Sequence, residues 1–178
     1  MSINEFTYKG DRKHALIPSL VSHDASASID FYKKVFDAKE TSRFNMKDKI
    51  AHAELVIDDT TIMIADEMFG PWAKSAKTIG DTPISLYVYM KSVDETVKKA
   101  VALGAKLFQP VKDEFWGDRT GIIVDPFGFK WCIATHIKQV DMDKMKSGLN
   151  EMMGQKGGSN FQYKYMKYKH KYQFLKHN

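Results

Sequence analysis

The stretch EFWGDRTGIIVDPFGFKWCIATH, from Glu114 to His136, decides the fold of this chain. Two short apolar runs with strand character, at 121–124 and 129–135, are separated by Asp125-Pro126-Phe127-Gly128. Proline and glycine at these places favour a tight turn, so the stretch predicts a β-hairpin. An aromatic and charged cluster at 115–119 precedes the hairpin. Loops at the ends of strands often carry functional residues, so this cluster is a candidate site.

The first half of the chain contains the same unit as the hairpin half, at a constant offset in the numbering. Matched positions are Ala38-Lys39 with Ala105-Lys106, Asp58 with Asp125, and 62–65 with 129–132, each pair 67 positions apart. One shared dipeptide would mean little, but the same order of helix, turn and hairpin recurs at the same offset. The sequence therefore predicts a tandem repeat of two βαβββ modules.

Each module is expected to contain a strand, a helix and three further strands. In the first, apolar residues at helical spacing predict a helix ending near Asp37, capped by Ser26 or Ser28. In the second, Gly104 ends the helix because glycine accepts the left-handed conformation of a helix stop. The expected strands are 14–22, 40–46, 50–57, 61–65, 83–90, 106–111, 121–124 and 129–135, with a linker at 68–82.

Composition and charge limit the class of protein. The 178 residues, 43% apolar, fit one domain or two small fused halves. Residues 1–137 carry 18 Lys and Arg against 19 Asp and Glu, whereas residues 138–178 carry 9 against 3. The basic character therefore belongs to the end of the chain. No apolar run approaches the roughly 18 residues of a membrane span, the first residues are polar, and the only cysteine is Cys132. We expect a cytoplasmic protein without membrane contact.

In the order of its motifs, the chain resembles the vicinal oxygen chelate superfamily, which includes glyoxalase I, extradiol dioxygenases and bleomycin resistance proteins, and within it the PhnB-like branch. The motifs are SIDFYKKVF (28–36), HAEL (52–55), the helix end at 100–105, WGDR (116–119) and DPFGFKW (125–131). The resemblance implies an α+β fold whose tandem βαβββ modules form an eight-stranded, incompletely closed barrel-like sheet around a cavity. The domain would span 14–137, with modules at 14–67 and 82–137, followed by a C-terminal helix at 138–155.

The resemblance also implies where metal-dependent members hold their ion, on the first and last strands of both modules. These places fall near Ile17 or Pro18, and at Ala65, Ser85 and Cys132. A divalent site needs imidazole or carboxylate ligands in at least three places, and these residues do not supply them. We therefore expect no cofactor, and a divalent metal only if the ligands are shifted to other positions.

Strand alternation predicts which side chains face the cavity. The candidate ligand-binding residues are His52, Glu54, Ser85, Tyr87, Tyr89, Trp116, Arg119 and Cys132. His52 and Glu54 could act as a general base and its neighbour, or as two ligands of a shifted metal site that Asp66 or Glu67 would complete. They could also be a hydrogen-bonded pair without a function. Arg119 could bind an anionic or carbonyl-bearing ligand through its guanidinium, or form a structural salt bridge. Trp116 could stack on a planar ligand or belong to the core.

The segment 156–178 alternates aromatic residues with lysines and has no acidic residue. Such a pattern can bind single-stranded nucleic acid, although we favour a solvated appendage or a strand lent to a neighbouring subunit. The sequence as a whole predicts a homodimer that holds a small planar or amphipathic molecule in a metal-free, mostly apolar cavity. The alternatives are a metal-dependent isomerase, lyase or dioxygenase, and nucleic-acid or partner binding through the tail.

Overall fold

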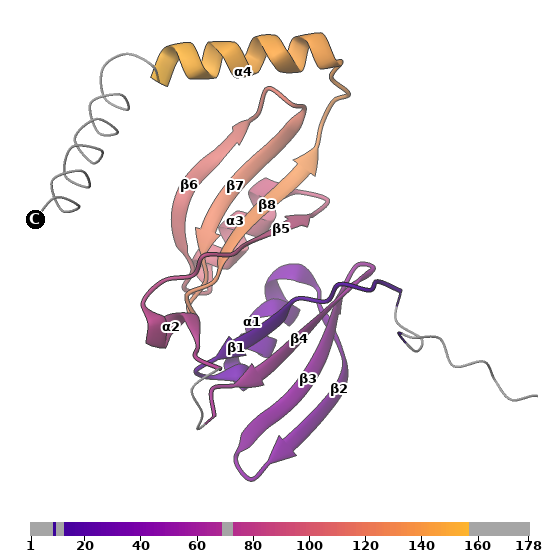
Figure 1. Cartoon of the computed structure of the whole chain (residues 1–178), viewed down its shortest axis with the longest axis vertical. Coiled ribbons are helices and arrows are strands. Elements are labelled where there is room, and N and C mark those ends of the chain that lie inside the picture. The colour runs from indigo at the N-terminus through magenta and orange to yellow at the C-terminus, as the bar shows by residue number, and fades with distance from the viewer. Residues whose placement is uncertain (1–8, 10–12, 69–72, 157–178) are drawn as a thin grey trace, which may run out of the picture. The chain divides into compact units, whose positions relative to one another are not determined.

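The first module forms a four-stranded sheet with one helix on its face (Figure 1). The computed structural model describes residues 9, 13–68 and 73–156, so the predicted tail lies outside the described residues apart from its first position. The strand order is β1-β4-β3-β2, with β1 parallel to β4 and the other pairs antiparallel. The elements are β1 (Ser19–Ser22), α1 (Ala25–Phe36), β2 (Lys39–Met46), β3 (Lys49–Ile57) and β4 (Thr60–Asp66).

The second module repeats this arrangement with the strand order β5-β8-β7-β6 (Figure 1). Its elements are β5 (Ser85–Tyr89), α3 (Val93–Ala102), β6 (Lys106–Asp113), β7 (Asp118–Val124) and β8 (Lys130–His136). The predicted α+β fold of two βαβββ modules is therefore confirmed, as two separate sheets that do not close on each other. The predicted linker contains one short helix, α2 (Ala76–Ile79), and a last helix, α4, covers Met142–Lys156.

The start of α1 differs from the prediction. Asp24, and neither Ser26 nor Ser28, caps the helix, and its side chain accepts a hydrogen bond from the backbone N–H of Ala27 at 2.9 Å. Ser28 is fully buried instead, with its hydroxyl 2.7 Å from that of Ser22 on β1. Serine and aspartate cap helices about equally well, so the sequence alone does not show which of the neighbouring Ser and Asp residues is the cap. Tertiary contacts decide between them.

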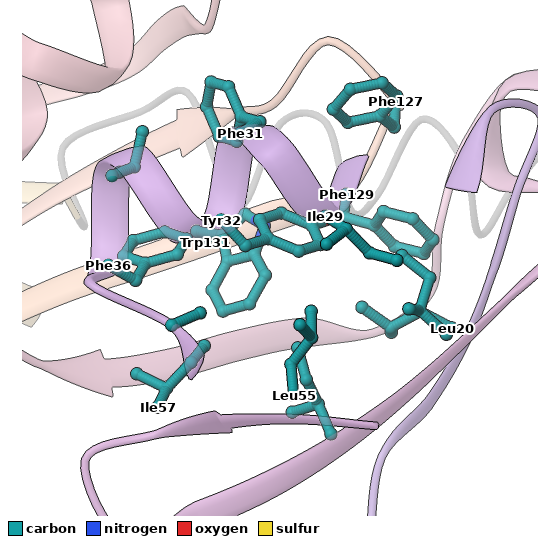
Figure 2. Close-up of a cluster of buried hydrophobic side chains, with 14 of the residues drawn as sticks. Leu20, Ile29, Phe31, Tyr32, Phe36, Leu55, Ile57, Phe127, Phe129 and Trp131 are labelled. Atoms are coloured by element: carbon teal, nitrogen blue, oxygen red, sulfur yellow. The ribbon is translucent and has the colours of Figure 1, made fainter. Parts of the chain in front are cut away.

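The core joins the two modules through α1 (Figure 2). The ring of Trp131 on β8 lies 5.2 Å from that of Tyr32 and 4.5 Å from that of Phe36, both on α1. The same helix packs against Leu55 and the rest of the apolar face of the first sheet. Burying rings of this size contributes about 1.5–3 kcal/mol each, so neither module has its full core alone.

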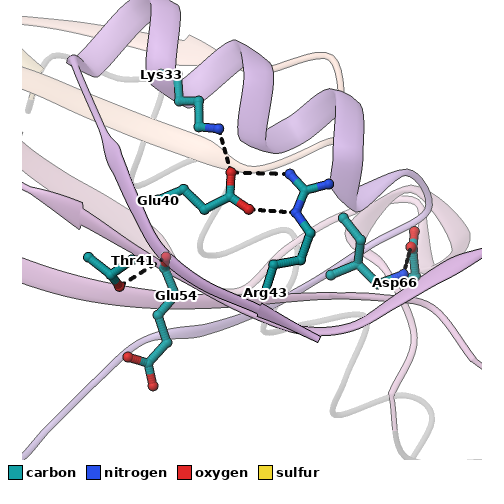
Figure 3. A network of polar contacts seen from close by, with 7 residues as sticks. Lys33, Glu40, Thr41, Arg43, Glu54 and Asp66 are labelled. Atoms are coloured by element: carbon teal, nitrogen blue, oxygen red, sulfur yellow. Dashed lines mark hydrogen bonds and ion pairs between the residues drawn. The ribbon is translucent and has the colours of Figure 1, made fainter. Parts of the chain in front are cut away.

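Charged contacts fasten α1 to the edge strand β2 (Figure 3). The carboxylate of Glu40 accepts hydrogen bonds from the ammonium of Lys33 on α1 and from the guanidinium of Arg43 on β2. The hydrogen bond from Arg43 lowers the pKa of Glu40 below its ordinary value. On β4, the buried carboxylate of Asp66 accepts a hydrogen bond from the backbone N–H of Ile50 on β3 at 2.7 Å.

The described chain divides into two compact units. The first contains both helix-covered sheets, up to residue 112 and again over 119–135, and the second contains 113–118 and 136–156. In the second unit the backbone N–H of Ile137 donates to the carbonyl of Gly117 at 2.9 Å, which ties the loop before β7 to the end of β8. Across the described residues, none of the helices has the length and apolar character needed to traverse a bilayer.

Candidate functional site

The open face of the first sheet, opposite α1, carries His52 and Glu54 of β3. His52 Nε2 lies 3.4 Å from Glu54 Oε1, and the ring of Phe44 on β2 lies 6.2 Å from the imidazole. The strand pairing places Phe44 opposite His52 and Ser42 opposite Glu54, so these side chains share one face. The ring of Phe44 is 65% exposed, which leaves an apolar surface next to a polar pair.

A β-bulge in β3 directly precedes this pair. Phe44 is paired with His52, but the next residue, Asn45, is paired with Ile50, so Ala51 is an extra residue in β3. A bulge reverses the alternation of the side chains, because one residue is left without a cross-strand partner. Ile50 is therefore buried under the helix while His52 faces away from it.

The open face of the second sheet carries Tyr87 and Tyr89 on β5. Their rings lie 5.3 Å apart and are 49% and 58% exposed. The parallel register pairs Tyr87 with Cys132 and Ser85 with Lys130, so the predicted residues of β5 and β8 share this face. Cys132, the only cysteine of the sequence, is partly buried. The ammonium of Lys130 lies 2.8 Å from a carboxylate oxygen of Asp81.

Arg119 does not lie on this face, which corrects the prediction. Its guanidinium donates two hydrogen bonds of 2.8 Å to the carboxylate of Asp94 in the first turn of α3. Gly121 shares its side of β7, and a Cβ there would lie 3.1 Å from Val97 of α3. Arg119 is thus on the helix-covered side, in a salt bridge with Asp94.

Trp116 belongs to the second unit, where it contacts Phe115 edge to face with ring centroids 5.0 Å apart. Its indole N–H donates to Asp118 Oδ2 at 3.2 Å, and His136 Nδ1 lies 2.8 Å from the other oxygen of the same carboxylate. The hydrogen bond with Asp118 raises the pKa of His136 above its ordinary value. His136 was missed as a candidate, although it ends the stretch that decides the fold.

The acidic residues proposed to complete a shifted metal site are engaged elsewhere. Asp66 is buried on the helix side, where it accepts from the backbone N–H groups of Ala25 and Ile50. Glu67 accepts from the backbone N–H and hydroxyl of Ser75 and from the hydroxyl of Thr78. Over residues 9, 13–68 and 73–156, no three His, Cys, Asp or Glu side chains converge as a metal site would require.

Comparisons with known proteins agree with this fold. The sequence profile of the Glyoxalase/Bleomycin resistance protein/Dioxygenase superfamily matches residues 13–133. An uncharacterized protein of Mycobacterium bovis is 36% identical over 76% of this chain and 92% of its own length. TioX from Micromonospora is 25% identical over 68% of this chain and 98% of its own, with a TM-score of 0.55. The PhnB protein from Bacillus cereus, 17% identical over 68% and 99%, has the same fold at a TM-score of 0.55.

Proposed function

This chain belongs to the glyoxalase/bleomycin resistance protein/dioxygenase superfamily, and on that premise we propose that it binds a small planar or amphipathic molecule without a metal. The observation that carries the proposal is the exposure of aromatic rings on the open faces of both sheets. Phe44, Tyr87 and Tyr89 are all about half exposed or more, at positions where sheet proteins usually place polar residues. Apolar surface of this kind commonly marks a ligand or partner site.

The mechanism is sequestration by stacking. The rings of Tyr87 and Tyr89 offer two aromatic surfaces to a planar molecule, since aromatic pairs gain about 0.5–1.5 kcal/mol beyond the burial of their area. The His52–Glu54 pair supplies a donor and an acceptor that orient a polar group on the ligand. A mostly apolar site with a few fixed polar groups is the usual design of a small-molecule site. Ser85 and Cys132 would be further contacts on the second sheet.

A second copy of the chain would cover the open faces, and we include a homodimer in the proposal. Two equivalent copies related by a two-fold axis can cover both sheets of each chain, because a two-fold interface uses the same patches twice. Analytical ultracentrifugation should give the mass of a dimer. Phe44→Asp should shift the equilibrium toward the monomer, whereas Ile79→Asp, on the exposed surface of α2, should leave it unchanged.

The ligand can be found by thermal-shift screening of aromatic antibiotics and metabolites. Phe44→Ala and Tyr87→Ala should each reduce the shift caused by a bound compound, because each removes a stacking surface. Ile79→Ala is the matched control, since Ile79 is similarly exposed but lies outside both sheets. Trp116→Ala tests whether Trp116, the candidate ligand-binding residue in the second unit, also contacts the compound. If no compound in a broad library stabilises the protein, the proposal fails.

The alternative is a metal-dependent isomerase, lyase or dioxygenase with shifted ligands. The 3.4 Å approach of His52 Nε2 to Glu54 Oε1 favours it, because an imidazole and a carboxylate on one face are suitable first ligands. Elemental analysis of protein purified without chelators distinguishes the two functions. Stoichiometric nickel, zinc, iron or manganese that is lost in His52→Ala would support the enzyme and contradict the metal-free proposal.

A further inference from the structure

A pocket of about 280 Å³ lies beside β5, bounded by that strand and by the turn between β3 and β4. Its floor is apolar and includes Ile57, Ile62, Leu86 and Trp131. Ile57, Ile62 and Trp131 are almost fully buried, so these parts of the floor belong to the hydrophobic core. The pocket can therefore take the apolar body of a molecule a little smaller than a typical drug.

The charged groups at the rim of this pocket are carboxylates. Asp58 and Asp59 form the turn at its edge, and no basic side chain occurs among the described residues that line it. Asp58 has a φ of 53°, a left-handed conformation that Asp and Asn tolerate better than most residues. A ligand that enters the pocket thus meets negative charge at the rim and hydrocarbon beneath it.

One of these carboxylates already holds a primary ammonium group. Asp59 Oδ2 accepts a hydrogen bond of 2.9 Å from Nζ of Lys13, which reaches it from the segment before β1. The hydrogen bond from Lys13 lowers the pKa of Asp59 below its ordinary value. Lys13 does not line the pocket. Its hydrogen bond with Asp59 therefore shows that a carboxylate at the rim can bind a primary ammonium group, while the apolar floor stays open.

Aromatic rings complete the rim on the other side. Tyr87 and Tyr89 line the pocket as well as the open face of the second sheet. The faces of such rings attract cations, by about 0.5–1 kcal/mol at exposed sites. Carboxylates, aromatic faces and an apolar floor together match an organic cation, whereas they would repel an anion.

From this arrangement we propose that the pocket binds a small primary amine with an aromatic or branched aliphatic body. The body lies on the floor formed by Ile62, Leu86 and Trp131, and the ammonium group binds the carboxylates of Asp58 and Asp59. Lys13 is an internal competitor for Asp59. This site shares Tyr87 and Tyr89 with the ligand site proposed on the open faces. It differs from that site in its charged groups, which lie on the β3–β4 turn, and in its apolar floor.

The test is isothermal titration of the full-length protein at neutral pH with 2-phenylethylamine and with 2-phenylethanol. The two probes share a body and differ in charge. The alcohol should bind about fivefold more weakly or worse, since it loses an exposed ion pair and a cation–aromatic contact. Lys13→Ala should strengthen binding of the amine several-fold, because it removes the ammonium that pairs with Asp59 Oδ2. The contacts of Asp59 with Nε2 of His14, at 3.8 Å, and with the hydroxyl of Thr60, at 3.0 Å, remain in this variant.

The double variant Asp58→Asn and Asp59→Asn should reduce amine affinity to that of the alcohol. Asparagine keeps the left-handed turn at position 58, so the fold is retained. Asp48→Asn is the matched control, since Asp48 is exposed in the turn between β2 and β3. Phe44→Ala, which alters the open face of the first sheet, should not change amine binding. Absence of amine binding, equal affinity for both probes, or unchanged affinity in the double variant would overturn the proposal.

Discussion

The phenol of Tyr32 donates a hydrogen bond of 2.8 Å to Oδ2 of Asp125, which links the helix of the first module to the turn of the second. The same carboxylate accepts from the indole N–H of Trp131 at 2.9 Å and from the backbone N–H groups of Phe127 and Phe129. Burial raises the pKa of Asp125, and burial also raises the pKa of Tyr32 well above its ordinary value. One carboxylate thus fixes both the hairpin turn and the junction of the modules.

Tyr32→Phe should destabilise the protein by about 1–3 kcal/mol, because it removes a donor from a buried carboxylate while keeping the ring. Urea denaturation followed by tryptophan fluorescence measures the change. Tyr89→Phe is the control, since Tyr89 is 58% exposed, and this variant should stay within about 0.5 kcal/mol of the wild type. Equal effects in the two variants would mean that the Tyr32–Asp125 contact does not join the modules.

Arg119→Gln should lower stability without changing ligand binding. The bidentate salt bridge with Asp94 is partly exposed, so its loss should cost up to about 1 kcal/mol. A double-mutant cycle with Asp94→Asn should show that the two effects are coupled. If Arg119→Gln instead lowered the affinity for a compound that binds the open faces, without changing stability, Arg119 would be a ligand-binding residue as the sequence predicted.

The His136–Asp118 pair should make part of the stability depend on pH. The folded-state pKa of His136 is raised, so its contribution is fully present below its unfolded value near 6.5. That contribution is lost as the pH rises through the folded pKa. Proton NMR titration should show a pKa for His136 above 6.5, and Asp118→Asn should lower it. A pKa that does not respond to Asp118→Asn would disprove the assignment.

Gly117→Ala should destabilise far more than Gly80→Ala. Both glycines have positive φ, but a Cβ at position 117 would lie 2.1 Å from the carbonyl oxygen of Lys138, whereas nothing lies within 4 Å at position 80. Both variants carry the same kind of backbone strain, of about 1–2 kcal/mol, so the difference between them measures the steric clash. Thermal unfolding of the two proteins gives this comparison. Similar melting temperatures would show that the loop at 117 and residue 138 are not in contact.

The sequence predicted the fold well because apolar periodicity and turn residues determine each βαβββ module. The hairpin at 118–136 and the stop at Gly104, with a φ of 99°, follow from such local signals. Alternation along β8 also predicted which side chains face the helix and which face away from it. Trp131 and Ile133 are buried, whereas Cys132 between them lies on the open face with Tyr87. The short helix α2 was not, because four residues are too few to show a period.

The site was harder to predict, because the constant offset of 67 positions does not hold for every strand. It pairs His52 with Arg119, yet the first faces away from its helix and the second binds Asp94 on α3. The turn after β3 covers 58–59, whereas the turn after β7 covers 125–129, and this difference shifts the alternation by one residue. A one-residue shift moves every side chain to the other face, and no local signal in the sequence reveals it.

The most direct test of the account is the affinity of a compound found by the thermal-shift screen, measured by titration before and after dialysis against a chelator. We predict the same dissociation constant in both conditions, and an affinity about fivefold lower in Tyr87→Ala, because stacking on that ring is lost. Binding that disappears on chelation, returns with a divalent metal and is unaffected by Tyr87→Ala would contradict the central claim.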